Sequence, residues 1–128
     1  MRSVKPELYV RTPVDKGLQE AFLAIRSSFL GDLDKVNEVA IDHGAGFVGV
    51  AFAPCRLGNG YKVLVYYTSE VTQVMVGKEC IGLGQAIDFL YKAYTEYINP
   101  PIEPKYLAEL IKMLAEKVAK LYTESLKA

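Results

Sequence analysis

The sequence predicts an α+β fold, with a small antiparallel sheet of about three strands flanked by two N-terminal and two C-terminal helices. Apolar residues recur at helical spacing toward both ends of the chain, whereas segment 47–76 is rich in Val and Tyr, which favour strands. The chain has 128 residues, of which 51% are hydrophobic, so it can bury a core without disulfides or metals. We therefore expect one α+β domain that covers residues 1–128.

The first helix is expected to begin near Thr12 and Pro13, because threonine caps helices and proline suits the first helical position. A glycine commonly follows the last helical residue, so Gly31 marks the expected end. The inner face of this helix is expected to carry Leu18, Phe22, Ile25 and Phe29.

The following segment, up to Gly44, has two interpretations. A cap at Asp32 or Asp34 and apolar residues at helical spacing predict a short second helix that ends at Gly44. Residues 38–41, however, could also form a strand, because a short apolar run does not distinguish the two structures.

The middle of the chain predicts three strands. Residues 47–53 are almost continuously apolar and end at Pro54, and residues 61–68 and 71–76 alternate in the way that a strand requires. Short links at 57–60 and 69–70 join them, which is typical of an antiparallel meander. The second strand is expected to turn Val63, Val65 and Tyr67 to one face.

Two helices are expected at the C-terminal end. The first opens at Gly82 and Gly84 and stops before Pro100, and the second runs from Glu103–Pro104 to about Leu126. The stripe predicted to be buried on the first is Leu83, Ile87, Leu90, Tyr91, Tyr94 and Ile98. The stripe predicted on the second is Leu107, Leu110, Ile111, Leu114, Val118 and Leu121. The outer face of the last helix alternates Lys and Glu, which is typical of a solvated face.

One glycine run suggests a cofactor site. Gly44, Gly46 and Gly49 form a G-x-G-x-x-G pattern, which cradles phosphate groups when a helix follows it. The stretch 39–46 resembles the first glycine-rich motif of S-adenosylmethionine-dependent methyltransferases, in which an acidic residue precedes the glycines as Asp42 does here. The resemblance implies that Glu70, after the next strand, binds a ribose.

The context of the run favours another interpretation. A nucleotide cradle needs a strand before the glycines and a long helix after them, but Pro54 would end such a helix early. The chain is also too short for the additional βα units of those folds. We therefore expect a helix-terminal glycine at Gly44 followed by a buried strand, and no cofactor.

No catalytic or metal site is predicted. The single histidine, His43, lies beside Asp42 and could form a general base with it, but a contact with free carbonyls at a helix end is the favoured interpretation. Cys55 and Cys80 are too few for a zinc site. They could pair, but reduced thiols are favoured, and Cys80 is expected in the core.

The net charge and composition limit the classes of binding partner that we expect. Fifteen basic residues balance fifteen acidic ones, which gives no electrostatic case for a nucleic-acid or membrane binder. The N-terminal residues do not form a signal peptide, so we expect a cytoplasmic protein. The scarcity of Asn and Gln suggests a thermophilic source.

The sequence favours a non-catalytic role in protein interaction or assembly, with a protein partner or a second copy of the chain. Tyrosines are enriched at interfaces, and the candidates here are Tyr66, Tyr91, Tyr94 and Tyr97. One alternative is a small protein that binds a nucleotide or S-adenosylmethionine through Asp42, Gly44, Gly46, Gly49 and Glu70. In size and helix–sheet–helix layout the chain is also similar to the small subunits of archaeal CRISPR surveillance complexes, which implies contact with nucleic acid only inside a complex.

Overall fold

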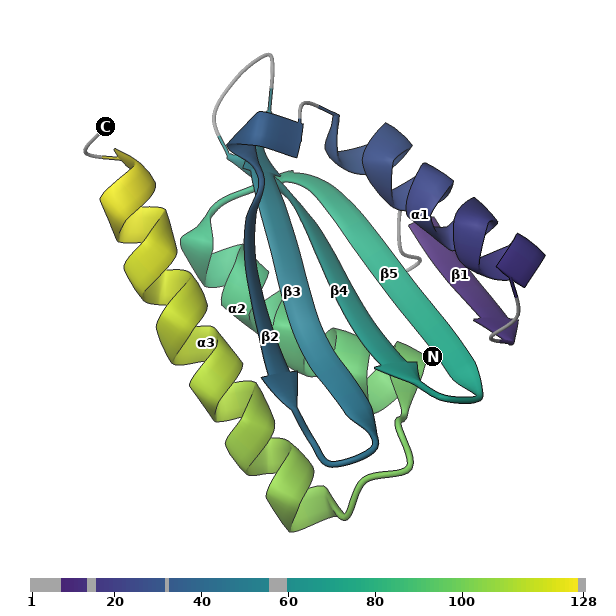
Figure 1. Ribbon diagram of the computed structural model, residues 1–128. Coiled ribbons are helices and arrows are strands. Elements are labelled where there is room, and N and C mark those ends of the chain that lie inside the picture. Colours follow the sequence, from purple (N-terminus) through teal and green to yellow (C-terminus); the bar gives the residue numbers. More distant parts are fainter. Residues whose placement is uncertain (1–7, 14–15, 32, 56–59, 127–128) are drawn as a thin grey trace, which may run out of the picture.

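The computed structural model describes residues 8–13, 16–31, 33–55 and 60–126, and the side chains of 23–31, 34–55 and 60–124 within them. The fold is α+β, as predicted, and its sheet has five antiparallel strands in the order β1-β5-β4-β3-β2 (Figure 1). The elements are β1 (Leu8–Pro13), α1 (Lys16–Leu30), the 3₁₀ turn η1 (Leu33–Lys35), β2 (Asn37–Asp42), β3 (Gly46–Pro54), β4 (Tyr61–Ser69), β5 (Thr72–Ile81), α2 (Leu83–Lys92), the π-helix η2 (Ala93–Ile98) and α3 (Pro104–Leu126).

The predicted meander is present as β3, β4 and β5. Its strands pair with their sequence neighbours, with Val50 opposite Val65 and Val65 opposite Val76. Val63, Val65 and Tyr67 are buried on one face, as the alternation of β4 predicts. The number of strands differs from the prediction, because β1 adds to β5 and β2 adds to β3.

Of the two interpretations of the segment before Gly44, the strand is correct and the short second helix is wrong. After the short turn η1, the chain forms β2, in which Val39 is buried while Glu38 and Ala40 are exposed. A period of two matches a strand with one face on the core, and six consecutive pairs with β3 stabilise it. Gly44 therefore follows a strand and not a helix.

The first helix begins later than expected. Thr12 and Pro13 belong to β1 and pair with β5, and α1 begins at Lys16. The helix ends as predicted at Gly31, whose positive φ of 79° and N–H bond to the carbonyl of Ser27 at 2.9 Å are typical of a C-terminal glycine. The side chains of Leu18 and Phe22 lie outside the described residues.

The sheet is covered on both faces. Helices α2, η2 and α3 pack on one face over the larger core, which includes Val48, Phe52 and Tyr94. Helix α1 packs on the other face, where Leu30 meets a smaller cluster with Met75. Figure 1 shows α3 running beside β2, at the opposite margin of the sheet from β1 and α1.

The buried face of α2 differs from the predicted stripe. Phe89 is buried between Ala86 and Ala93, whereas Tyr91 is 42% exposed. The buried face of α2 is thus formed by Ala86, Phe89 and Leu90. The prediction of Leu90, Tyr94 and Ile98 as core residues is confirmed, although Tyr94 and Ile98 lie in the π-helix.

The last helix follows the prediction closely. Asn99 ends η2 in the left-handed conformation, with φ 47°, and α3 begins at Pro104. The Glu103 carboxylate accepts the N–H of Lys105 at 3.0 Å, which caps the free end. Four residues of the predicted stripe are fully buried: Leu110, Ile111, Leu114 and Val118.

The two cysteines correct a further expectation. Cys55, just after β3, and Cys80, in β5, form a disulfide with Cα atoms 5.7 Å apart, so they are not reduced thiols. Cys80 is exposed and has φ 57°, so it is not a core residue. It lies where the pairing of β4 with β5 shifts register, and this irregularity turns its side chain out of the core.

Candidate functional site

The edge strand β2 has one margin without a strand partner. Within the described ranges β2 pairs with β3 alone, and helix α3 runs beside its other margin. Proteins usually blunt such edges with lysine, proline or a bulge, or cover them with a helix or loop. The sequence of β2, Asn37–Asp42, contains neither lysine nor proline, its pairing with β3 is regular over six residues, and α3 lies beside it across a groove. This margin is therefore suited to pairing with another extended chain.

A groove follows this margin. It has a volume of about 410 Å³ and lies between β2 and α3. Three consecutive β2 residues, Glu38, Val39 and Ala40, line one wall. Since consecutive strand residues point to opposite faces, the feature they share is the strand edge. The other wall is one face of α3, formed by Lys117, Lys120, Leu121 and Glu124 at helical spacing.

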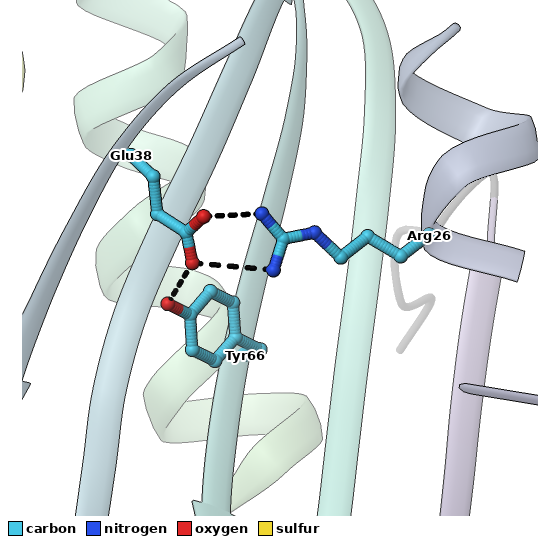
Figure 2. A network of polar contacts seen from close by, with 3 residues as sticks. All are labelled: Arg26, Glu38 and Tyr66. Atoms are coloured by element: carbon cyan, nitrogen blue, oxygen red, sulfur yellow. Dashed lines mark hydrogen bonds and ion pairs between the residues drawn. The ribbon is translucent and has the colours of Figure 1, made fainter. Parts of the chain in front are cut away.

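The negative charge of Glu38 is compensated by a cation from helix α1. The Arg26 guanidinium, from α1, makes a bidentate ion pair with the Glu38 carboxylate, and Nη1 lies 3.2 Å from Oε2 (Figure 2). The Tyr66 hydroxyl, from β4, donates to the same Oε2. Only 22% and 33% of the Arg26 and Glu38 side chains are exposed, so the pair is screened weakly by water. On the α3 wall, Lys117 and Lys120 then outnumber the single acid, Glu124.

Tyr66 owes its position to a glycine. Its ring lies over Gly49, where the Cβ of any other residue would overlap the ring. The Arg26 guanidinium carbon lies 5.9 Å from the ring centroid, within cation–π range. Burial, followed by the hydrogen bond to Glu38 and the charge of Glu38, raises the pKa of Tyr66 well above its usual value, and Arg26 opposes this. Tyr66 therefore stays a protonated donor.

The same strand pair is held from the other face by Tyr94. This side chain is fully buried, and its hydroxyl accepts the N–H of Gly49 at 2.8 Å and donates to the carbonyl of Tyr66. The carbonyl of Gly49 lies 3.2 Å away as a second acceptor. Burial raises the pKa of Tyr94 strongly. The hydrogen bond from the Gly49 N–H lowers this pKa, but by less than burial raises it.

The predicted glycine cradle lies elsewhere in the fold from this groove. Gly44 occupies the turn between β2 and β3, where its N–H binds Asp42 Oδ1 at 2.8 Å, and Gly46 and Gly49 belong to β3. The chain runs from strand to turn to strand, so it lacks the helix N-terminus that a phosphate cradle needs. Glu70 is exposed in the β4–β5 turn. Binding of a nucleotide or S-adenosylmethionine therefore stays a prediction, and no helix N-terminus supports it here. The residues predicted for it are Asp42, Gly44, Gly46, Gly49 and Glu70.

The four candidate interface tyrosines have different surroundings. Tyr66 is 6% exposed and Tyr94 is fully buried, so both stabilise the sheet from inside. Tyr97 is half-buried against the core, and Tyr91 is the most exposed of the four. Sequence reasoning missed the groove residues because Lys117 and Lys120 were assigned to a solvated face. The sequence carries no signal that brings these lysines next to segment 38–41, which is more than 70 residues away along the chain.

The residues considered for catalysis are not arranged as a site. His43 stacks on Tyr67 with ring centroids 5.1 Å apart, and its buried Nε2 has no hydrogen-bond partner. Asp42 binds the backbone of Gly44, so the described contacts do not include an Asp–His pair. Cys55 is bound in the disulfide and cannot act as a thiolate. Among the described residues, no three His, Cys, Asp or Glu side chains gather as a metal site.

Comparisons with known proteins add no functional assignment. The chain matches no protein-family model, no curated protein and no solved structure. Within the ranges that the structure describes, no helix combines the length and the apolar character needed to cross a membrane.

Proposed function

We propose that the chain is a non-catalytic protein-interaction module that binds an extended segment of a partner protein along the free edge of β2. The observation that carries this proposal is the groove whose walls are the edge of β2 at three consecutive residues and one face of α3. In such β-strand addition, main-chain hydrogen bonds supply affinity and side-chain contacts supply specificity.

The charges of the groove favour an acidic partner segment. Lys117 and Lys120 have no ion pair among the described contacts, while Glu38 is neutralised by Arg26 and Tyr66. A segment paired with β2 would place every second side chain on the α3 side of the sheet. Acidic residues at those positions would meet the two lysines, which outnumber the single acid on this wall, Glu124, so basic residues are less favoured.

The polar network around Glu38 supports the proposal. Arg26 and Tyr66 fix the Glu38 side chain on the α1 face, so it does not project across the strand edge. The edge is thus held in a regular, extended form before a partner arrives. Preorganisation of this kind lowers the ordering cost of binding.

Two hexapeptides with alternating side chains test the proposal, one of Glu and Val and one of Lys and Val. We expect the acidic peptide to bind with backbone NMR shifts concentrated in 37–42, and the basic peptide not to bind. The double variant Lys117→Glu/Lys120→Glu should reverse this preference. A matched control, Lys105→Glu/Lys112→Glu, changes the same charge at exposed α3 positions outside the groove and should bind like the native chain.

Equal binding of both peptides, or shifts away from β2, would contradict the proposal. So would a stable dimer by light scattering that Ala40→Pro converts to monomer, because the occupant of the edge would then be a second copy. The other two functions predicted from the sequence stay predictions, testable by binding of S-adenosylmethionine and nucleotides and by low-salt filter binding of single-stranded nucleic acid.

A further inference from the structure

A second hollow lies at the C-terminal end of α1, on the same face of the sheet as that helix. It has a volume of about 480 Å³ and is formed where the ends of α1 and β3 meet the start of β4. Sites for small molecules have volumes of roughly 300–1,000 Å³, so it can hold a small organic ligand. It shares no lining residue with the β2 groove, so the inference drawn from it does not rest on the proposed function.

Two charged residues line this hollow among those that the structure describes, and both are cationic. They are Lys35, from η1, and Lys62, from β4. Only 20% of the Lys62 side chain is exposed, and it forms an ion pair with Glu79 at the margin of ion-pair distance, 3.9 Å. Such a long pair is weak. An anion near the two lysines would give Lys62 a further negative partner.

The rest of the lining is largely apolar. Leu30 and Ala53 are buried, and Pro54 completes this part of the wall. Helix α1 ends beside it at Gly31, and the negative end of the helix dipole disfavours an anion there. An apolar group is therefore favoured against the end of α1, and the negative charge is favoured on the side of Lys35 and Lys62.

The disulfide fixes one wall of the hollow. Cys55 lines it and is bonded to Cys80 in β5, which ties the end of β3 to a strand two places away in the sheet. The wall is thus covalently held, and a ligand would meet a preformed surface.

We propose that this hollow binds a small organic anion, whose carboxylate or phosphate group lies between Lys35 and Lys62 and whose apolar body packs on Leu30, Ala53 and Pro54. Both headgroups present the same chemistry to the lysines, namely oxygen atoms that accept charge-assisted hydrogen bonds. A neutral molecule of the same size lacks this interaction.

Titrations with hexanoate, hexyl phosphate and hexanol, followed by backbone and side-chain NMR, test the proposal. We expect one or both anions to shift the signals of Leu30, Ala53 and Lys62, and hexanol to bind at least about tenfold more weakly, since a charged hydrogen bond contributes ~1.5–3 kcal/mol. Binding by only one anion would identify the headgroup.

Substitutions locate the site. Lys35→Gln and Lys62→Gln should each weaken anion binding by about tenfold. The control Lys112→Gln removes the same charge from an exposed α3 position and should leave binding unchanged. Thermal unfolding of each variant shows whether it is folded.

Failure of both anions to bind, equal binding of hexanol, or equal weakening by Lys112→Gln would overturn the inference. Lys117→Glu/Lys120→Glu is expected to leave anion binding intact, which separates this site from the β2 groove.

Discussion

The Tyr94 hydroxyl binds the main chain of Gly49 through the sheet's inner face, accepting its N–H at 2.8 Å. The same hydroxyl donates to the carbonyl of Tyr66, the residue opposite Gly49 on β4. On the outer face, the Tyr66 ring occupies the space that the missing Gly49 side chain leaves. The pair of strands β3 and β4 is therefore held from both faces. Tyr66 also donates to the Glu38 carboxylate, which forms the ion pair with Arg26.

Tyr94→Phe should destabilise the fold by about 1–3 kcal/mol, because it leaves buried backbone groups of Gly49 and Tyr66 without their hydroxyl partner. Urea unfolding measures the change. Tyr91→Phe is the matched control: it removes the same hydroxyl from an exposed position on the preceding helical turn. A surface change of that kind should stay within about 0.5 kcal/mol. Equal effects of the two variants would contradict the role given to Tyr94.

Gly49→Ala should cost about 1–3 kcal/mol, because the new Cβ overlaps the Tyr66 ring and forces it from its place. The cost should shrink when Tyr66 is replaced by Ala, and a double-mutant cycle measures this coupling. Gly84→Ala is the control, since nothing lies near its Cβ and alanine favours the helix there. It should stabilise the protein by a few tenths to about 1 kcal/mol. Additive effects of the Gly49 and Tyr66 changes would contradict the packing explanation.

Stability should fall in strong alkali. The pKa of Tyr66 and of Tyr94 is raised in the folded state, so the folded protein holds these protons more tightly than the unfolded chain. The contribution is complete below the unfolded pKa of about 10 and is lost as the pH rises through the folded values. Urea unfolding across this range measures the slope. A stability that rises with pH above 10 would contradict the prediction.

Glu38→Gln should make Tyr66 ionise at a lower pH than in the native chain. The carboxylate charge raises the pKa of Tyr66, and without it Arg26 faces the phenol without an anionic partner. Tyrosinate absorbance during a base titration, compared with a Tyr66→Phe reference, follows this group. An unchanged or higher ionisation point in Glu38→Gln would show that the network in Figure 2 does not set the state of Tyr66.

The strands of the meander were predictable because their apolar pattern is local. Segment 61–68 alternates with a period of two, and this alone assigns Val63, Val65 and Tyr67 to one face. Segment 7–11 fits a short strand or an ordered arm from the sequence alone, and the pairing of Leu8 with Gly77, which joins distant parts of the chain, assigns β1 to the sheet. Strand β2 is short, and its four central residues fit a helix or a strand until β3 provides a partner.

The candidate site was less predictable than the fold, because it depends on tertiary contacts. Nothing in the spacing of Arg26, Glu38 and Tyr66 indicates that α1, β2 and β4 bring them together. Lys117 and Lys120 were recognised only as part of a charged helix face, and the edge of β2 gives them their significance. The tyrosine pattern did single out Tyr66 and Tyr94, but burial makes them internal supports of the sheet.

Reduction of the Cys55–Cys80 disulfide should destabilise the protein by about 3–4 kcal/mol, as expected from chain entropy for a closed loop of about this length. The bridge joins two residues 25 positions apart, so its loss frees the whole segment 55–80, which includes β4 and most of β5, in the unfolded chain. Thermal unfolding with and without a phosphine reductant measures the change. The Cys55→Ala/Cys80→Ala variant, which cannot form the bridge, should match the reduced protein and show no response to the reductant. A native protein whose unfolding temperature is unaffected by reduction would contradict the stabilising role of the bridge.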